Sequence, residues 1–408
     1  MSTEVRAATE AELGDYIGCL KTAFLAEREV TAEEVSWKAA HTDLGRTFCA
    51  FSDGALCGTA RTFPTDLTVP GGSLRASAIT EVTVLPTHHR KGHLRAMMQA
   101  MLADASRRAE PVAILTASEW PIYSRFGFGP ASERVSFEMR APDAQFSAPR
   151  SGSVAMVGVH ELRSLAPGIY DLIRPRTVGA LNRDPEWWDS LLNVEVRPGW
   201  PAPKNRVRVV WRDDGGHAQG YVIYDTTEIW SDGVPSGEVQ VRELMAATPD
   251  AYRELWRYVC ELDLVGTVRA NHRPVDEPLA HLIADGRVVR TRARIDHLWV
   301  RLLDVKECLS GRSYSEPGRV VFEVDDPMSE SVSRFSVEGD SKGGSAEATT
   351  DEPEILLGIT ELGAAYLGGV SFAALAMSGR IYERAPGSVA RADAMFGIRP
   401  LPWLTTNF

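Results

Sequence analysis

The stretch that decides the fold reads Val82-Thr83-Val84-Leu85-Pro86-Thr87-His88-His89-Arg90-Lys91-Gly92-His93-Leu94-Arg95. Its first residues predict a strand over residues 78–85, which Pro86 ends, and a helix is expected from roughly residue 90 to residue 109. A glycine-bearing turn between a strand and a helix points several backbone N–H groups at one spot, where the helix dipole also favours negative charge. The stretch therefore predicts a cradle for a pyrophosphate group.

The charge around this stretch supports the same interpretation. Between residues 88 and 108 there are five Lys and Arg residues and one Asp, although the whole chain carries 44 Lys and Arg against 55 Asp and Glu, a net charge of −11. A basic island in an acidic chain suits phosphate binding. The alternative that the residues leave open is an ordinary strand-to-helix turn followed by a solvated basic helix.

A second candidate lies downstream of a short apolar strand expected over residues 112–115. There the chain reads Ala117-Ser118-Glu119 and then Ile122-Tyr123-Ser124-Arg125-Phe126-Gly127-Phe128-Gly129. The phenol of Tyr123, with an ordinary pKa of ~10, can protonate a departing thiolate whose thiol has a pKa of ~8.5. Tyr123 is therefore a candidate general acid. The alternative is an aromatic side chain half-buried beside Phe126 and Phe128.

The composition narrows the class of protein. With 408 residues, 44% of them hydrophobic and 24% charged, the chain is expected to form two or three globular cores. Its acidic balance argues against nucleic acid as a ligand. The sequence shows neither a run of ~18 uncharged apolar residues nor a basic and apolar leader, so we expect no membrane segment and a cytoplasmic location. Five scattered cysteines without a CxxC pair, and nine histidines without HxH or HExxH spacing, predict neither disulfides nor a metal site.

Three segments follow one another along the chain. A polar, proline-containing stretch over residues 141–153 is expected to link the first segment, residues 1–150, to the second, residues 151–295, and a third covers residues 296–408. The order of strand, proline and helix recurs around Pro249, which suggests a degenerate internal repeat. Because Thr248-Pro249-Asp250-Ala251-Tyr252 contains no glycine, a second phosphate cradle is not expected there.

The first stretch resembles the acetyl-CoA motif of the GNAT acyltransferases, V-x-V-x-P-x-x-[QR]-x-x-G-x-[GA]. The matching residues are Val82, Val84, Pro86 and Gly92. His89 stands where Gln or Arg is usual, and Leu94 stands where a small residue is usual. The stretch that begins at Tyr123 looks like the Y-x-x-x-G-F signature of the same superfamily.

Over its whole length the chain resembles the mycobacterial enhanced intracellular survival (Eis) family of GNAT N-acetyltransferases. The stretches that carry this resemblance are Val84-Leu85-Pro86-Thr87-His88, Leu94-Arg95-Ala96-Met97, Ala117-Ser118-Glu119, residues 122–130, His281-Leu282-Ile283 with Asp285, and His297-Leu298-Trp299-Val300-Arg301. The resemblance implies an α+β chain with two GNAT-like acyltransferase domains in tandem. A sterol-carrier-protein-like α/β domain would follow, with a tail that reaches the active site. The resemblance also implies a homohexamer.

By the same resemblance, the first domain would bind acetyl-CoA and transfer its acetyl group to an amine by direct attack in a ternary complex. Tyr123 would be the general acid, and the general base would be the α-carboxylate of the last residue, Phe408. The residues expected to bind acetyl-CoA are Val82, Thr83, Val84, Arg90, Lys91, Gly92, His93, Leu94, Arg95, Ser118 and Glu119. The alternative for Phe408 is that its side chain packs on the last domain.

The acceptor is expected to be a cationic small-molecule amine. Residues 1–45 contain nine acidic and four basic residues, and an acidic rim attracts cations. Together with the resemblance, this favours aminoglycosides or similar polyamines, and hence a role in antibiotic resistance. Two alternatives stay open. One is a protein lysine N-acetyltransferase; the other is a non-catalytic acyl-CoA or lipid-binding protein in which an apolar helix over residues 354–367 lines a lipid tunnel.

Overall fold

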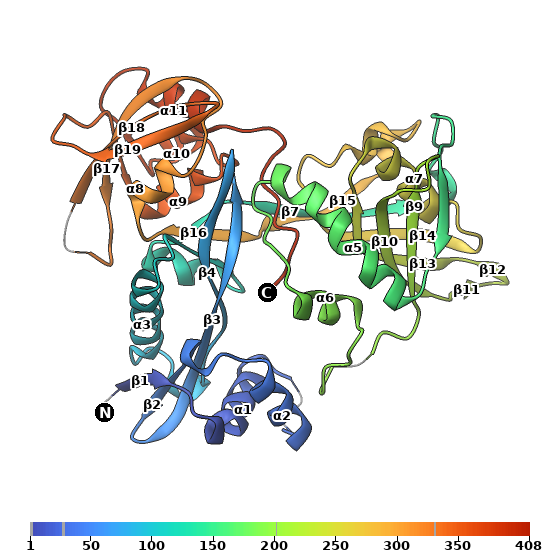
Figure 1. Ribbon diagram of the computed structural model, residues 1–408, viewed down its shortest axis with the longest axis horizontal. Coiled ribbons are helices and arrows are strands. Elements are labelled where there is room, and N and C mark those ends of the chain that lie inside the picture. Colours follow the sequence, from blue (N-terminus) through green and yellow to red (C-terminus); the bar gives the residue numbers. More distant parts are fainter. Residues whose placement is uncertain (1–2, 27–28, 201, 330–331) are drawn as a thin grey trace. The chain divides into compact units, whose positions relative to one another are not determined.

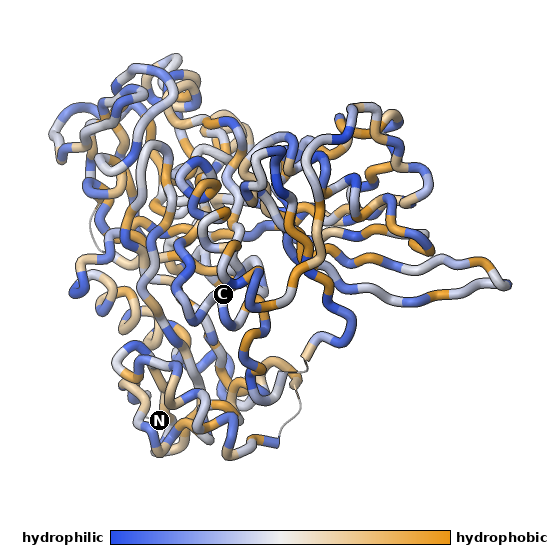
Figure 2. Tube along the Cα trace, turned by 45° about the vertical axis from the view of Figure 1, so that its right-hand side comes forward, coloured by the Kyte–Doolittle hydropathy of each residue, from blue (hydrophilic) through white to orange (hydrophobic). Residues whose placement is uncertain are grey.

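The structure, a computed structural model, describes residues 3–26, 29–200, 202–329 and 332–408. The chain forms two compact units (Figure 1). One contains the chain up to Ser132, the short segment Arg197–Gly199 and residues Asp296–Phe408, and the other contains Glu133–Val196 and Trp200–Ile295. Hydrophobic and hydrophilic residues alternate in short runs along the trace (Figure 2).

A seven-stranded sheet organises the first unit. Its order is β1-β2-β3-β4-β5-β16-β6, with the bounds Thr3–Ala7, Thr47–Ser52, Ala55–Val69, Gly72–Val84, Val112–Thr116, Leu298–Leu302 and Gly129–Pro130. Its helices are α1 (Leu13–Ala23), α2 (Ala32–Ala40), α3 (His93–Arg107) and α4 (Trp120–Tyr123). The strand, turn and helix predicted around Pro86 are confirmed as β4, a short 3₁₀ turn and α3. Met97 and Met101 lie four residues apart on one face of α3 and are fully buried against the sheet.

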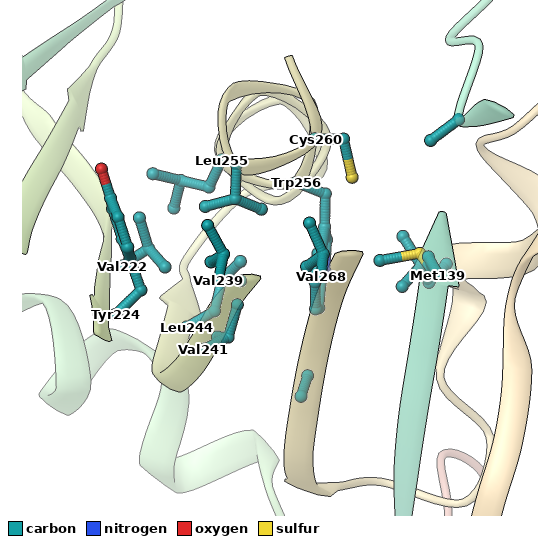
Figure 3. Close-up of a cluster of buried hydrophobic side chains, with 14 of the residues drawn as sticks. Met139, Val222, Tyr224, Val239, Val241, Leu244, Leu255, Trp256, Cys260 and Val268 are labelled. Atoms are coloured by element: carbon teal, nitrogen blue, oxygen red, sulfur yellow. The ribbon is translucent and has the colours of Figure 1, made fainter. Parts of the chain in front are cut away.

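The second unit repeats this plan. Its sheet has the order β8-β9-β10-β13-β14-β7-β15, with the bounds Ser153–Met156, Arg206–Arg212, Ala218–Thr227, Gly237–Ala246, Val265–Arg273, Glu133–Arg140 and Arg290–Asp296. Its further elements are α5 (Val159–Ile173), α6 (Pro185–Leu192), α7 (Pro249–Cys260) and the hairpin strands β11 (Trp230–Ser231) and β12 (Val234–Pro235). In each sheet the fourth and fifth strands form a parallel pair, β4 with β5 and β13 with β14. Figure 3 shows Leu255 and Trp256 of α7 lying over Val239 and Val268 of the second sheet. The matching strand order confirms the internal repeat.

Each sheet contains one strand that the boundaries expected from the sequence assign to another segment. β7 follows β6 along the chain but pairs with β14 in the second sheet, and β16 follows β15 but pairs with β5 in the first. The boundary expected at residue 150 therefore differs from the structure, in which the first unit gives way to the second after Ser132. The composition of residues 141–153 identifies a loop, but it carries no information about which sheet the preceding strand joins.

A five-stranded sheet forms the last domain. Its order is β19-β18-β17-β20-β21, with the bounds Gly343–Ala348, Val332–Asp340, Gly318–Asp325, Ile355–Gly358 and Tyr382–Glu383. Its helices are α8 (Val305–Ser310), α9 (Ile359–Tyr366), α10 (Phe372–Met377) and α11 (Ser388–Phe396). The helix expected over residues 354–367 is wrong in its first part, because Ile355–Gly358 is a strand paired in parallel with β17. A short, wholly apolar run fits a buried strand and a buried helix equally well.

Aromatic side chains fill the interior of this last domain. The ring centroids of Phe322, Phe372 and Phe396 lie between 5.1 and 5.9 Å apart. The guanidinium group of Arg312 is buried beside this cluster, 4.6 Å from the ring centroid of Phe396, and donates to the carbonyl oxygens of Tyr366 and Phe396. A packed interior that holds a hydrogen-bonded cation gives no support to the lipid tunnel considered above.

Close packing of α9 on β6 and β16 makes two glycines sensitive to substitution. A Cβ atom at Gly129 would lie 2.0 Å from the carbonyl oxygen of Thr360, and one at Gly363 would lie 2.3 Å from that of Val300. Gly129→Ala is therefore expected to lower the free energy of unfolding by roughly 1–3 kcal/mol, measured by urea denaturation. The control is Gly168→Ala within α5, whose Cβ meets no atom within 4 Å and which is expected to be neutral or stabilising. Equal stability of Gly129→Ala and the wild type would contradict this packing.

Candidate active site

The parallel pairing of β4 and β5 stops partway along β4. The last paired residues are Ile79 and Leu115, whereas β4 continues to Val84. On its other edge this end of β4 remains paired with β3, as between Thr83 and Thr59. In the described part of the chain, the edge of β4 over residues 80–84 that faces β5 thus has no strand partner. We call this place the β4–β5 split; it can receive an extended ligand through backbone hydrogen bonds.

The predicted binding residues Val82, Thr83 and Val84 lie on this edge. The hydroxyl of Thr83 is buried and lies 2.6 Å from that of Thr59, on β3, so that Thr83 offers the split its backbone only. The side chains of Val82 and Val84 pack against the core. Ser118 and Glu119 are exposed just beyond the carboxyl end of β5. Because β4 and β5 are parallel, both sets of residues lie at the same end of the strand pair.

The turn that follows β4 has the backbone of an anion-binding loop. Arg90 and Gly92 both adopt left-handed conformations, with φ angles of 62° and 90°. Gly92 is the N-cap of α3, makes no side-chain cap, and a Cβ placed on it would meet no atom within 4 Å. The N–H groups of the first helical turn are therefore accessible at the positive end of the helix. The side chains of Arg90, Lys91 and Arg95 are exposed around them, so the residues present fit a pyrophosphate.

The side chains of His93 and Leu94, also predicted to bind the coenzyme, turn toward the core. His93 is 2% exposed, and neither of its ring nitrogens has a hydrogen-bond partner among the described residues. Burial lowers the pKa of His93, which favours the neutral imidazole. Leu94 packs with the core around Met97 and leaves the cradle open. Both residues can therefore contribute only their backbone N–H groups. His89, the other departure from the motif, places Nε2 at 2.9 Å from the carbonyl oxygen of Val84.

The C-terminal tail, the red trace that ends at C in Figure 1, brings Phe408 into contact with Thr116, the last residue of β5. The hydroxyl of Thr116 donates to a carboxyl oxygen of Phe408 over 3.5 Å, and the ring of Phe408 packs edge-on against that of Phe63, with 5.5 Å between centroids. One residue earlier, Asn407 Oδ1 lies 2.8 Å from His297 Nε2. These contacts tie down a chain end that would otherwise be loose. They place its α-carboxylate at the carboxyl end of β5, next to the split.

Tyr123, the last residue of α4, is 6% exposed. Its ring packs against that of Phe128, with 6.4 Å between centroids, so the aromatic contact considered above is present. Burial, together with the negative charge of Glu119, raises the pKa of Tyr123 to about 12, and the phenol keeps its proton at neutral pH. In the described part of the chain its hydroxyl makes no hydrogen bond, which leaves that proton available to a ligand.

The structure also contains a buried charged cluster that the sequence reasoning missed. Glu81 interrupts β4 with a left-handed φ angle of 56°. Its carboxylate accepts from the Tyr16 hydroxyl over 2.8 Å and from Lys38 Nζ over 2.7 Å, and Arg61 Nε lies 3.4 Å away. Burial opposes ionisation, but the charges of Arg61 and Lys38 hold the pKa of Glu81 below its ordinary value. These four residues are called the Glu81 cluster below. The signal in the sequence was a lone glutamate within residues 76–84 of β4, which are otherwise uncharged.

Some of the acidic residues in the first segment are paired with cations instead of forming a rim. Glu12 lies 2.6 Å from Arg6, and hydrogen bonds from Arg6 and from the backbone at Thr9 lower its pKa to about 2. Glu34 lies 2.7 Å from Lys21. Each of these pairs uses one acid and one base, so the surplus of acidic residues in the segment is unchanged, but Glu12 and Glu34 themselves already have cationic partners.

In the second sheet, the end of β13 corresponds to the β4–β5 split and the start of α7 to the start of α3. At both places groups of the protein itself make the contacts. β13 also continues past its last residue paired with β14, but there Arg273 donates to the carbonyl oxygen of Leu244 over 2.9 Å and forms an ion pair with Glu277 at 3.0 Å. At the start of α7, the hydroxyl of Thr248 accepts from the N–H of Ala251. Because these groups already have partners, this geometry supports the prediction that the second segment offers no coenzyme cradle.

The described residues contain no group of three or more His, Cys, Asp or Glu side chains arranged to hold a metal ion. Among those same residues, no helix combines the length and the apolar character needed to cross a membrane. All five cysteines are buried.

Comparison with known proteins gives a matching division of the chain. Residues 4–131 and 179–302 each match the acetyltransferase (GNAT) domain, and residues 305–405 match the sterol carrier protein domain. An uncharacterized N-acetyltransferase of Streptomyces griseus is 36% identical over 419 residues, which cover 100% of both chains. The N-acetyltransferase Eis of Mycobacterium tuberculosis is 33% identical over 344 residues, 81% of this chain and 80% of that protein.

Solved structures agree with these sequence matches. Eis1 from Mycobacterium abscessus has a TM-score of 0.84 and 31% identity, covering 99% of this chain and 100% of that one. A GCN5-related N-acetyltransferase from Anabaena variabilis is only 16% identical but shares the fold over 100% of both chains, with a TM-score of 0.86. Two GNAT domains, a sterol carrier domain and these relatives show that the chain belongs to the Eis family of GNAT N-acetyltransferases.

Proposed function

We propose that this protein transfers the acetyl group of acetyl-CoA to a primary amine of a small molecule, by direct attack in a ternary complex. The observation that carries the proposal is the meeting of three features at the β4–β5 split. These are an unpaired strand edge, a cradle of free amides with basic side chains around it, and the carboxylate of Phe408. The two GNAT matches support an acyl-CoA co-substrate.

Acetyl-CoA, when bound, would supply an acetyl group activated as a thioester. The amides at Gly92 and the side chains of Arg90, Lys91 and Arg95 would hold its pyrophosphate. The backbone of residues 82–84 would hold the extended arm of the coenzyme. Fixing both reactants in this way can contribute as much as roughly 7–11 kcal/mol to lowering the barrier.

Phe408 and Tyr123 would handle the protons. An amine arrives protonated, and the carboxylate of Phe408, with an ordinary pKa of ~3.5, would hold the ammonium and accept its proton directly or through water. A bond then forms between the amine nitrogen and the acetyl carbon, and the carbon–sulfur bond breaks. Tyr123 would give its proton to the departing sulfur, and its raised pKa keeps that proton in place until then.

Two acceptor classes are proposed, the first from the family resemblance and the second because the same catalytic groups would serve it. Aminoglycosides or similar polyamines come first, with a consequence for antibiotic resistance, and protein lysine side chains come second. Because Glu12 and Glu34 are engaged in ion pairs, the other acidic residues of the first segment would have to attract a polyamine. The homohexamer is likewise a proposal from the resemblance, and light scattering of the purified chain tests it.

Initial rates on a panel of amines test the proposed reaction. The full-length chain is mixed with acetyl-CoA and with kanamycin, spermidine or a lysine-containing peptide, and CoA thiol release and product mass are followed. We expect amine-dependent thiol release and a product heavier by one acetyl group. Faster turnover of the peptide than of the small amines would favour the lysine alternative. Binding of CoA without turnover of any amine would overturn the proposal and favour a non-catalytic binding protein.

A further inference from the structure

A β-bulge lies on β4 at the point where that strand parts from β5. Between Thr80 and Thr83, two residues of β4 face one residue of β3. On its other edge, the last residue of β4 that pairs with β5 is Ile79. Because a bulge bends its strand and increases the local twist, it gives a physical reason for β4 to leave β5 after Ile79.

Glu81 lies inside this bulge, in a left-handed conformation that costs free energy for a residue with a Cβ. Such a conformation persists where the surroundings hold it. The hydroxyl of Thr59 donates to the Glu81 carbonyl oxygen over 2.9 Å. The carboxylate of Glu81 accepts from Tyr16 on α1 and from Lys38 on α2, and it lies 3.4 Å from Arg61 Nε. The Glu81 cluster therefore joins α1 and α2 to the bulge.

The second sheet contains a bulge and a buried carboxylate at the same place. The last residue of β13 that pairs with β14 is Val241, and the pairing of β13 with β10 shifts register between Val241 and Glu243. Glu243 thus follows the last paired residue by two positions, as Glu81 does. Its carboxylate accepts from Tyr221 over 2.9 Å and from Arg183 over 2.6 Å. In both sheets a tyrosine and a cation hold a glutamate at the bulge.

This repetition indicates that the carboxylate serves the shape of the strand and not proton transfer. The geometry of the second sheet supports no coenzyme cradle, and there the side chain of Arg273 donates to the carbonyl oxygen of Leu244, directly after Glu243. A carboxylate at the bulge is therefore present in both sheets, whereas the cradle is present in one. In the first sheet burial opposes ionisation of Glu81, but the neighbouring cations hold its pKa below the ordinary value, which makes it a weak proton acceptor.

We infer that Glu81 is a positioning residue whose carboxylate holds the bulge of β4 and so keeps the β4–β5 split open for the extended arm of acetyl-CoA. The inference rests on the coenzyme site of the proposed acetyl transfer. The cradle at Gly92 follows the bulge along the chain and contains no residue of the Glu81 cluster. Loss of the carboxylate should therefore weaken binding of the arm and leave binding of the pyrophosphate unchanged.

Two ligands, one with the arm and one without it, test this inference. CoA and adenosine 3′-phosphate 5′-diphosphate share the nucleotide and the pyrophosphate, but only CoA has the pantetheine arm, and calorimetry on the full chain gives the Kd of each. In Glu81→Gln the Kd for CoA is expected to rise at least about tenfold, while that for the nucleotide stays within about twofold. Tyr16→Phe removes one hydrogen bond to the carboxylate and should raise the Kd for CoA alone, by about threefold. At saturating acetyl-CoA, the kcat of Glu81→Gln should stay within about threefold of that of the wild type.

The matched control is Glu243→Gln, which removes the equivalent carboxylate from the second sheet and should leave both Kd values unchanged. Thermal unfolding compares the loss of stability in the two variants. Equal weakening of both ligands, or an unchanged Kd for CoA in Glu81→Gln, would overturn the inference. A kcat about a hundredfold lower at unchanged Kd would overturn it too, by making Glu81 a proton acceptor. If Glu81→Gln does not fold, Tyr16→Phe decides by the same contrast.

The inference and the proposed function fail separately, because binding is measured without turnover. If the expected contrast is found but no amine is acetylated, the proposed function fails and the positioning role of Glu81 stands. If amines are acetylated and the contrast is absent, the positioning role is overturned and the proposed function stands. A wild type that binds no CoA would overturn both.

Discussion

Deletion of Phe408 is expected to lower kcat by about a hundredfold or more while the Kd for CoA changes little. The deletion removes the ring that packs against Phe63 and withdraws the terminal carboxylate by one residue, about 3.5 Å, from Thr116. The cradle at Gly92 belongs to the turn between β4 and α3 and is not altered. Rates at saturating amine and calorimetric titration with CoA measure the two effects separately.

Two companion variants distinguish the carboxylate of Phe408 from its ring. Addition of one glycine after Phe408 keeps the ring but moves the carboxylate, and it should reproduce most of the loss. Phe408→Leu keeps a terminal carboxylate behind an apolar side chain, and it should retain most of the activity. A deletion variant with the wild-type kcat would show that another group accepts the proton from the amine.

Tyr123→Phe is expected to have the second large effect, a decrease in kcat of about a hundredfold, since general acid catalysis contributes roughly 10²–10⁴-fold. The phenylalanine ring can keep the contact with Phe128, so the midpoint of thermal unfolding and the affinity for CoA should stay near those of the wild type. The decrease should become smaller with an acetyl thioester whose thiol is more acidic, because a better leaving group needs less protonation.

The pH dependence gives an independent check on Tyr123. Because burial raises its pKa to about 12, the acid form persists as the pH rises, and kcat should show no alkaline decline from this group below about pH 11. The control is Tyr382→Phe, which removes the hydroxyl of an exposed tyrosine on β21 and should leave kcat unchanged. If Tyr123→Phe keeps the full rate and the wild-type pH profile, Tyr123 serves only in packing.

The sequence predicted the parts of the fold that local residues determine. Pro86 lacks the N–H that a central strand needs, and Gly92 adopts a φ angle of 90° without strain. These two residues therefore predict, in order, the end of a strand, a turn and the start of a helix. The run from Ile355 to Gly358 shows the limit of such reasoning. All of its side chains are apolar, so no alternation of polar and apolar residues distinguishes a strand from a helix. The run forms a strand because it pairs with β17.

The candidate site divides in the same way. The cradle was predictable because its residues are consecutive and its chemistry depends on backbone N–H groups. The Glu81 cluster was not, because Tyr16, Lys38 and Arg61 come from α1, α2 and β3 and meet Glu81 only in the folded chain. The similarity of the two sheets was predictable from the recurring order of strand, proline and helix. Only the strand pairing showed that β7 joins the second sheet and β16 the first.

The most direct test of the account is a crystal structure of the full chain with CoA and an amine. We predict that the pyrophosphate lies on the first-turn amides of α3, from Gly92 to Arg95. We also predict the coenzyme's sulfur within hydrogen-bond reach of the Tyr123 hydroxyl, and the amine nitrogen against the carboxylate of Phe408. Coenzyme bound in the second unit, or a sulfur atom remote from both Tyr123 and Phe408, would contradict the account.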